Sequence, residues 1–135
     1  MTNVKRKFTA LASLLILLII GACASSQKAT KVSLVGDEKD IVEVTADSFN
    51  FNPSLIETKS KDTIFLKITN ISSSSHNFTI KNPTGEVIQD VELPPNKTIT
   101  LEVNLKKPGT YEFYCDKPFH RMLGMKGSIE VIAAN

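Results

Sequence analysis

The sequence predicts an all-β protein, a Greek-key β-sandwich of about seven to eight strands over residues 40–135. From Asp40 onward, apolar and polar residues alternate in short segments, which is the period of a half-buried strand. Turn-forming Asn, Pro and Gly residues separate these segments at residues 82–85, 94–96 and 108–109. Outside the N-terminal apolar stretch, no window of helical period is long enough to compete with the strand pattern.

The predicted strands follow one another with apolar side chains on one face of each. In order along the chain, they are residues 41–49, 62–70, 76–80, 87–93, 98–105, 110–115 and 127–134. The first has Val42 and Val44 on one face, and the fifth has the clearest alternation, with Ile99, Leu101 and Val103 on one face. Two sheets that bury these faces against each other would form the core.

Two side chains with metal-binding chemistry lie on inward faces at strand ends. Cys115 ends its predicted strand on the same face as Tyr111 and Phe113. His76 begins its predicted strand on the same face as Phe78. Because antiparallel neighbours place the end of one strand beside the start of the other, we expect His76 near the loop that follows Cys115.

The first 22 residues indicate an export signal of the bacterial lipoprotein type. Three basic residues at 5–7 precede an apolar run at 8–20, which is shorter than the roughly 20 residues of a membrane-spanning helix. The run ends in Ile-Gly-Ala-Cys, which resembles the processing site that leaves a lipid-bearing cysteine, here Cys23, at the new N-terminus. An ordinary secretory signal that ends near Cys23 is the alternative.

Residues 23–39 are small and polar without any period, which predicts a flexible tether between lipidated Cys23 and the domain at 40–135. Removing residues 1–22 takes away three of the 16 basic residues and none of the 14 acidic ones, so the formal charge falls from +2 to −1. The remaining chain has no basic patch, so nucleic acid is not an expected partner. We expect an extracytoplasmic protein, in the periplasm or on the cell surface, that its lipid holds at a bacterial membrane.

Cys115, His120 and Met125 follow one another with four residues between each pair. They offer a thiolate, an imidazole and a thioether, and the chain has one other histidine, His76. One cysteine, two histidines and a weak methionine are the ligands of blue copper electron-transfer sites. An inert buried thiol is the alternative for Cys115, but exported proteins normally pair their cysteines. Met122 is a rival thioether, less favoured because of its spacing.

These motifs resemble those of the cupredoxins, the small blue copper proteins. The resemblance covers roughly residues 40–133 and rests on the His76-Asn77 pair, on Tyr-x-Phe-Tyr-Cys before the loop, and on the spacing of His120, Met125 and a following glycine. It implies one mononuclear copper ion with His76, Cys115 and His120 as equatorial ligands and Met125 as the axial ligand. It also implies that Asn77 ties the two ligand-bearing segments together.

The same resemblance implies that His120 reaches the surface within an apolar patch where redox partners dock. Pro118, Phe119 and Leu123 are the candidates for this patch. Phe119 stands where relatives with this loop length often have glycine, and it could either enlarge the apolar surface or fold back over the loop.

The sequence therefore predicts a monomeric shuttle that carries single electrons between membrane-associated redox proteins, and no enzyme. A periplasmic copper carrier is one alternative, disfavoured by the absence of Met-rich or His-rich tracts, and a metal-free immunoglobulin-like binding module is another. Zinc is the rival metal, but a thioether suits it poorly. A binuclear copper centre would need a second cysteine in the loop, and a copper oxidase would need further histidines; the chain has neither.

Overall fold

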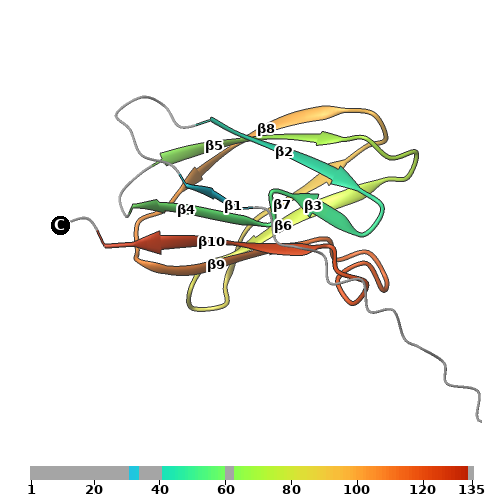
Figure 1. Ribbon diagram of the computed structural model, residues 1–135. Coiled ribbons are helices and arrows are strands. Elements are labelled where there is room, and N and C mark those ends of the chain that lie inside the picture. Colours follow the sequence, from blue (N-terminus) through green and yellow to red (C-terminus); the bar gives the residue numbers. More distant parts are fainter. Residues whose placement is uncertain (1–30, 34–40, 60–62, 134–135) are drawn as a thin grey trace, which may run out of the picture.

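Two β-sheets pack face to face in the computed structural model of the protein, which describes residues 31–33, 41–59 and 63–133 (Figure 1). The larger sheet contains, in spatial order, β1 (Lys31–Ser33), β4 (Leu55–Lys59), β10 (Lys126–Ile132), β9 (Gly109–Tyr114), β6 (His76–Lys81) and β7 (Val87–Leu93). The smaller sheet contains β3 (Asn50–Asn52), β2 (Ile41–Asp47), β5 (Thr63–Asn70) and β8 (Thr98–Asn104). The predicted all-β sandwich is confirmed.

The pairing of β6 with β9 decides where the ends of these two strands meet. They run antiparallel, with Thr79 opposite Tyr114 and Ile80 opposite Phe113. Extending this register toward the start of β6 brings His76 level with the chain just after Cys115, as the alternation of the two strands predicts. β9 also pairs with β10, so the loop between these two strands leaves and re-enters the same sheet.

The core lies between the sheets and is built from the inward faces of the strands. Val42 and Val44 of β2 and Ile64, Leu66 and Ile68 of β5 are buried, as their alternation predicts. Full burial of such a side chain contributes about 1.5–3 kcal/mol. The two sheets are therefore held together chiefly by aliphatic packing.

An aromatic cluster connects this core to the ligand-bearing strands. Phe78 and Phe113 stack with ring centroids 4.9 Å apart, and Phe51 contacts both rings edge-on at 5.0 and 5.7 Å. Phe78 is two residues beyond His76, and Phe113 is two residues before Cys115. Because residues two apart in a strand share a face, this cluster anchors the two strand ends that carry the ligands.

Gly127 of β10 allows the chain to return to the sheet after the loop. A Cβ at this position would collide with the ring of Phe113 and with the backbone carbonyl of Ser54. Glycine is therefore the residue that lets β10 approach β9 and the aromatic cluster this closely.

Three of the ten described strands, β1, β3 and β4, are not expected from the sequence pattern. β4 lies inside the larger sheet, parallel to both β1 and β10. Its buried face carries Ile56 and a polar residue, Thr58, so its alternation of apolar side chains is not visible in the sequence. The strand count therefore exceeds the predicted seven to eight.

The N-terminal predictions fall mostly outside the described residues. The predicted signal at 1–22, Cys23 and residues 24–30 and 34–39 of the predicted tether all lie there. The described part of that tether is the three-residue strand β1, which pairs with β4. Within the described residues, no helical segment has the length and apolar character needed to span a bilayer.

Candidate metal centre

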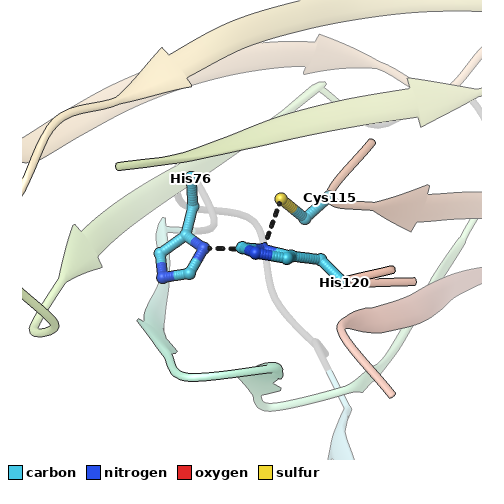
Figure 2. Close-up of side chains that lie close together, drawn as sticks. All are labelled: His76, Cys115 and His120. Carbon is cyan, nitrogen blue, oxygen red and sulfur yellow. Dashed lines mark hydrogen bonds between the residues drawn. The ribbon is translucent and has the colours of Figure 1, made fainter. Parts of the chain in front are cut away.

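Three of the predicted ligands meet at one end of the sandwich. His76 begins β6, Cys115 directly follows β9, and His120 lies in the loop between β9 and β10. One ligand atom from each residue lies within 4.8 Å of the others. Nδ1 of His120 is 3.2 Å from Nδ1 of His76 and 3.4 Å from Sγ of Cys115 (Figure 2). These atoms face one another as the ligands of a single ion would.

Main-chain hydrogen bonds shape the loop that carries His120. The N–H of Cys115 donates to the carbonyl of Met125 over 3.0 Å, and the N–H of Met125 donates to the carbonyl of His120 over 3.0 Å. The backbone of Met125 is thus tied to both ligand residues of this loop. Phe119 and Gly124 have φ angles of 68° and 113°, which give the loop its tight course.

The burial of the two methionines separates the rival thioethers. Met125 is fully buried beside the two ligands to which its backbone is bonded, whereas Met122 is 84% exposed. A thioether must leave solvent to reach a buried ion, so the structure supports Met125 as the fourth donor.

Asn77 joins the two segments that carry the ligands. Its Oδ1 accepts a hydrogen bond from the N–H of Asp116 over 2.8 Å, directly after Cys115. Its Nδ2 donates to Oγ1 of Thr79 over 3.1 Å and to Oδ1 of Asp90 over 2.9 Å. Because a carboxylate only accepts, Asp90 sets the amide so that its oxygen points at the ligand loop.

His76 is held in the form that binds a metal. Its side chain is almost completely buried, and this burial, together with the neighbouring His120 and Lys117, lowers the pKa of His76; Asp47 opposes the shift. The neutral imidazole is therefore favoured at neutral pH, and a neutral imidazole is the ligand form of histidine.

Phe49 contacts the site from the other sheet, in the turn between β2 and β3. Its ring meets the ring of His120 edge-on, with centroids 5.0 Å apart and planes at 89°. Its φ of 60° is unusual for a residue with a Cβ. The sequence pattern predicts Phe49 in a strand, and it does not predict this contact because no motif links Phe49 to a residue 71 positions away.

The three candidate docking residues are all exposed. Phe119 is 71% exposed, and Leu123 and Pro118 also face solvent, while His120 itself is only partly buried. Phe119 therefore enlarges the apolar surface beside His120 and does not fold back into the loop. A salt bridge of 3.0 Å between Lys117 and Glu92 joins the same loop to β7.

The family model of the cupredoxin-like domain matches residues 12–131. This chain belongs to the cupredoxin-like family.

Solved structures share the cupredoxin fold. Dithionite-reduced auracyanin from the photosynthetic bacterium Roseiflexus castenholzii aligns with a TM-score of 0.61 at 22% identity, over 71% of this chain and 98% of that one. Auracyanin B aligns with a TM-score of 0.59 at 20% identity, over 72% of this chain and 92% of that one. A multi-copper oxidase from Pediococcus acidilactici aligns with a TM-score of 0.60 at 16% identity, but over only 28% of its own length, against 76% of this chain.

The donor set of this cupredoxin fits one mononuclear type 1 copper ion. Metal bonds of about 2.0–2.3 Å to nitrogen and sulfur place neighbouring ligand atoms about 3.3–3.8 Å apart. The separation of 3.4 Å between Sγ of Cys115 and Nδ1 of His120 lies within this range, and the separation of 3.2 Å between the two Nδ1 atoms lies just below it. A thiolate and a thioether favour copper, and the thioether of Met125 is a poor donor for a closed zinc site.

Proposed function

We propose that this cupredoxin is a one-electron carrier. A copper ion held by His76, Cys115 and His120, with Met125 as a weaker ligand, would supply the Cu(II)/Cu(I) couple. The observation that carries the proposal is the convergence of two imidazoles and one thiol, all within 4.8 Å, at one end of the sandwich.

Rapid electron transfer needs a metal site whose geometry changes little between oxidation states. Several features of the chain meet this requirement. His76 is fixed at the start of β6, and the backbone N–H of Cys115 donates a hydrogen bond to the carbonyl of Met125. Asn77, through its hydrogen bond with the N–H of Asp116, connects the two segments that carry the ligands. Since the side chains of His76, Cys115 and Met125 are buried, water has little access to them.

His120 is the proposed point of electron exit and entry. It is partly buried, and three exposed apolar side chains, those of Pro118, Phe119 and Leu123, flank it in the chain. A small apolar contact of this kind binds weakly and releases its partner quickly, which suits a shuttle.

The proposed setting is a bacterial membrane surface outside the cytoplasm. The lipoprotein-type signal at 1–22 and Cys23 support a lipid anchor. Residues 23–39 would act as a tether that lets the domain extend away from the membrane. The proposed partners are membrane-associated redox proteins, and the proposed oligomeric state is a monomer.

We propose that the protein is an electron carrier and that it has no enzymatic activity. Among the described residues, the only cluster of at least three His, Cys, Asp or Glu side chains with metal-binding geometry is the one formed by His76, Cys115 and His120. A single such centre suits electron storage, and the similarity to the multi-copper oxidase covers a minor part of that protein. A copper-delivery protein would need ligands that release the ion readily, which the burial of His76 and Cys115 opposes.

The visible spectrum of the purified full chain with Cu(II) tests the proposal. We expect intense charge-transfer absorption that bleaches with ascorbate and returns on reoxidation. The Cys115→Ser variant should stay colourless, whereas Met122→Leu should match the parent chain. A colourless protein that binds zinc tightly would overturn the copper assignment, and fast loss of copper to a chelator in both oxidation states would favour delivery over electron transfer.

The anchor is tested separately by fractionation of cells that express the full chain. The parent protein should appear with membranes, and Cys23→Ser should abolish that association. A parent protein found only in soluble fractions would overturn the anchor and leave the copper site unaffected.

A further inference from the structure

A buried chain of hydrogen bonds reaches the far side of His76 from the segment between β5 and β6. Nε2 of His76, the ring nitrogen that does not face the other ligands, lies 2.9 Å from Oγ of Ser72. Oγ of Ser72 in turn lies 2.8 Å from Oδ1 of Asn70. All three residues are buried, and Ser72 is the only buried member of the four consecutive serines at 72–75.

The orientation of the Asn70 amide is determined by its partners. Its nitrogen lies 2.8 Å from the carbonyl of Ser74 and 2.8 Å from the carbonyl of Leu93, and carbonyls only accept. Its Oδ1 accepts from the N–H of Ser72 over 3.0 Å, which only donates. The atom of Asn70 that faces the Ser72 hydroxyl is therefore an acceptor.

The Ser72 hydroxyl has one proton, and its surroundings decide where that proton goes. Two acceptors lie near Oγ, namely Oδ1 of Asn70 at 2.8 Å and the carbonyl of Ser74 at 3.0 Å. If the proton pointed at His76, oxygen lone pairs would face each other at both of these contacts. The proton therefore goes to Asn70 or Ser74, and Oγ accepts a hydrogen bond from Nε2–H of His76.

The protonation of Nε2 determines the state of the other nitrogen. A neutral imidazole carries one ring proton, so a proton on Nε2 leaves a lone pair on Nδ1. Nδ1 is the atom that lies 3.2 Å from His120 and faces the ligand cluster (Figure 2). The hydrogen bonds thus present the lone pair of His76 to the site before any metal arrives.

We propose that Ser72, oriented by Asn70, is a positioning residue that locks His76 in the Nε2–H tautomer for metal binding. In metal sites generally, an outer hydrogen bond to the remote ring nitrogen fixes both the tautomer and the orientation of the ligand. Here that bond comes from a side chain, so a single substitution can remove it. The proposal rests on the proposed copper function for its consequence, but the tautomer itself belongs to the metal-free protein.

The first test measures the tautomer in the metal-free full chain labelled with 15N-histidine. Long-range 1H–15N spectra at about pH 8, above the ordinary histidine pKa of about 6.5, report which ring nitrogen of His76 carries the proton. We expect Nε2–H in the parent chain and in Ser72→Thr, which keeps a hydroxyl, and a mixture of tautomers in Ser72→Ala. Ser73→Ala, in an exposed serine of the same segment, is the control and should match the parent.

The second test is the affinity of the same four proteins for Cu(II), measured by competition with a chelator. We expect Ser72→Ala to bind about 10–100-fold more weakly, with Ser72→Thr and Ser73→Ala close to the parent. A parent chain with Nδ1–H at His76 would overturn the proposal without any variant, and so would unchanged affinity in a folded Ser72→Ala.

The two tests separate this proposal from the proposed function. A blue protein whose His76 lacks the Nε2–H tautomer would refute the proposed role of Ser72 and would leave the proposed electron-carrier function standing. A protein with the expected tautomer that binds no copper would refute the carrier and leave the hydrogen-bond arrangement correct.

Discussion

The two histidines of the site occupy contrasting surroundings. His76 is 1% exposed, begins a strand, and is held from behind by Ser72. His120 lies in a loop, is partly buried, and has the ring of Phe49 against its edge. The same side chain thus serves as an internal support in one place and lies at the surface in the other.

The two surroundings together give one site both a fixed geometry and access to solvent. The strand side, with His76 and Asn77, holds the geometry through one buried and one partly buried hydrogen bond. The loop side, with His120 and its exposed neighbours, provides the route by which an electron can enter or leave.

The largest effect is expected when each histidine is removed in turn. Both His76→Gly and His120→Gly should lose nearly all of the charge-transfer absorption of the copper-loaded protein. Free imidazole should restore the absorption in His120→Gly, because that cavity opens toward solvent, and should fail in His76→Gly, whose cavity is enclosed. Titration with imidazole, followed by the visible spectrum, is the measurement. Equal rescue of both variants would show that the contrast in burial does not control access.

The next largest effect distinguishes Met125 from Met122. Met125→Ala empties a fully buried position and should lower the free energy of unfolding of the metal-free protein by about 2–5 kcal/mol. Met122→Ala changes an 84% exposed side chain and should stay within about 0.5 kcal/mol of the parent. Chemical denaturation gives both values, and spectra of the copper-loaded proteins should change only for Met125→Ala. A changed spectrum in Met122→Ala would reassign the thioether.

A smaller effect is expected for the ring that supports His120. Phe49→Ala removes the edge-on contact and should destabilise the protein by about 0.5–1.5 kcal/mol beyond any loss from reduced burial. It should also speed the loss of copper to a chelator. Phe119→Ala is a useful control, because both phenylalanines have positive φ angles, 60° and 68°, and of these two rings it is that of Phe49 that meets the ring of His120. If the two variants lose copper at the same rate, the ring contact has no role.

The smallest effect is that of pH on the metal-free protein. Unfolded His76 takes up a proton as the pH falls through about 6.5, whereas the lowered pKa of folded His76 delays this uptake. Because the unfolded state binds more protons in that window, the free energy of unfolding falls below about pH 6.5, until the pH lies below the folded pKa. Denaturation curves between about pH 8 and 5 should show a fall that is smaller in His76→Ala. Identical pH profiles would contradict the lowered pKa.

Much of the fold and part of the site follow from local patterns in the chain. The alternation of Val42 with Val44, and of Ile64 with Leu66, predicts the inward faces that pack the two sheets. The same parity places Cys115 inward. These predictions succeed because a strand of period two has only two faces, and burial of apolar surface chooses between them.

Other features depend on pairings that no local pattern contains. The interior position of β4 is decided by its parallel partners β1 and β10, since its own buried face mixes an isoleucine with a threonine. The choice between Met122 and Met125 depends on how the loop turns through Phe119, whose φ is 68°. Both outcomes are set by hydrogen bonds across the sheet and within the loop.

The all-β class, the ligand types and their spacing along the chain therefore follow from the sequence alone. The contact between Phe49 and His120, and the position of Ser72 behind His76, depend on how distant segments pack in the folded protein. The physical reason is that spacing constrains residues within one strand or loop, whereas contacts between segments depend on strand register and on the packing of one sheet over the other.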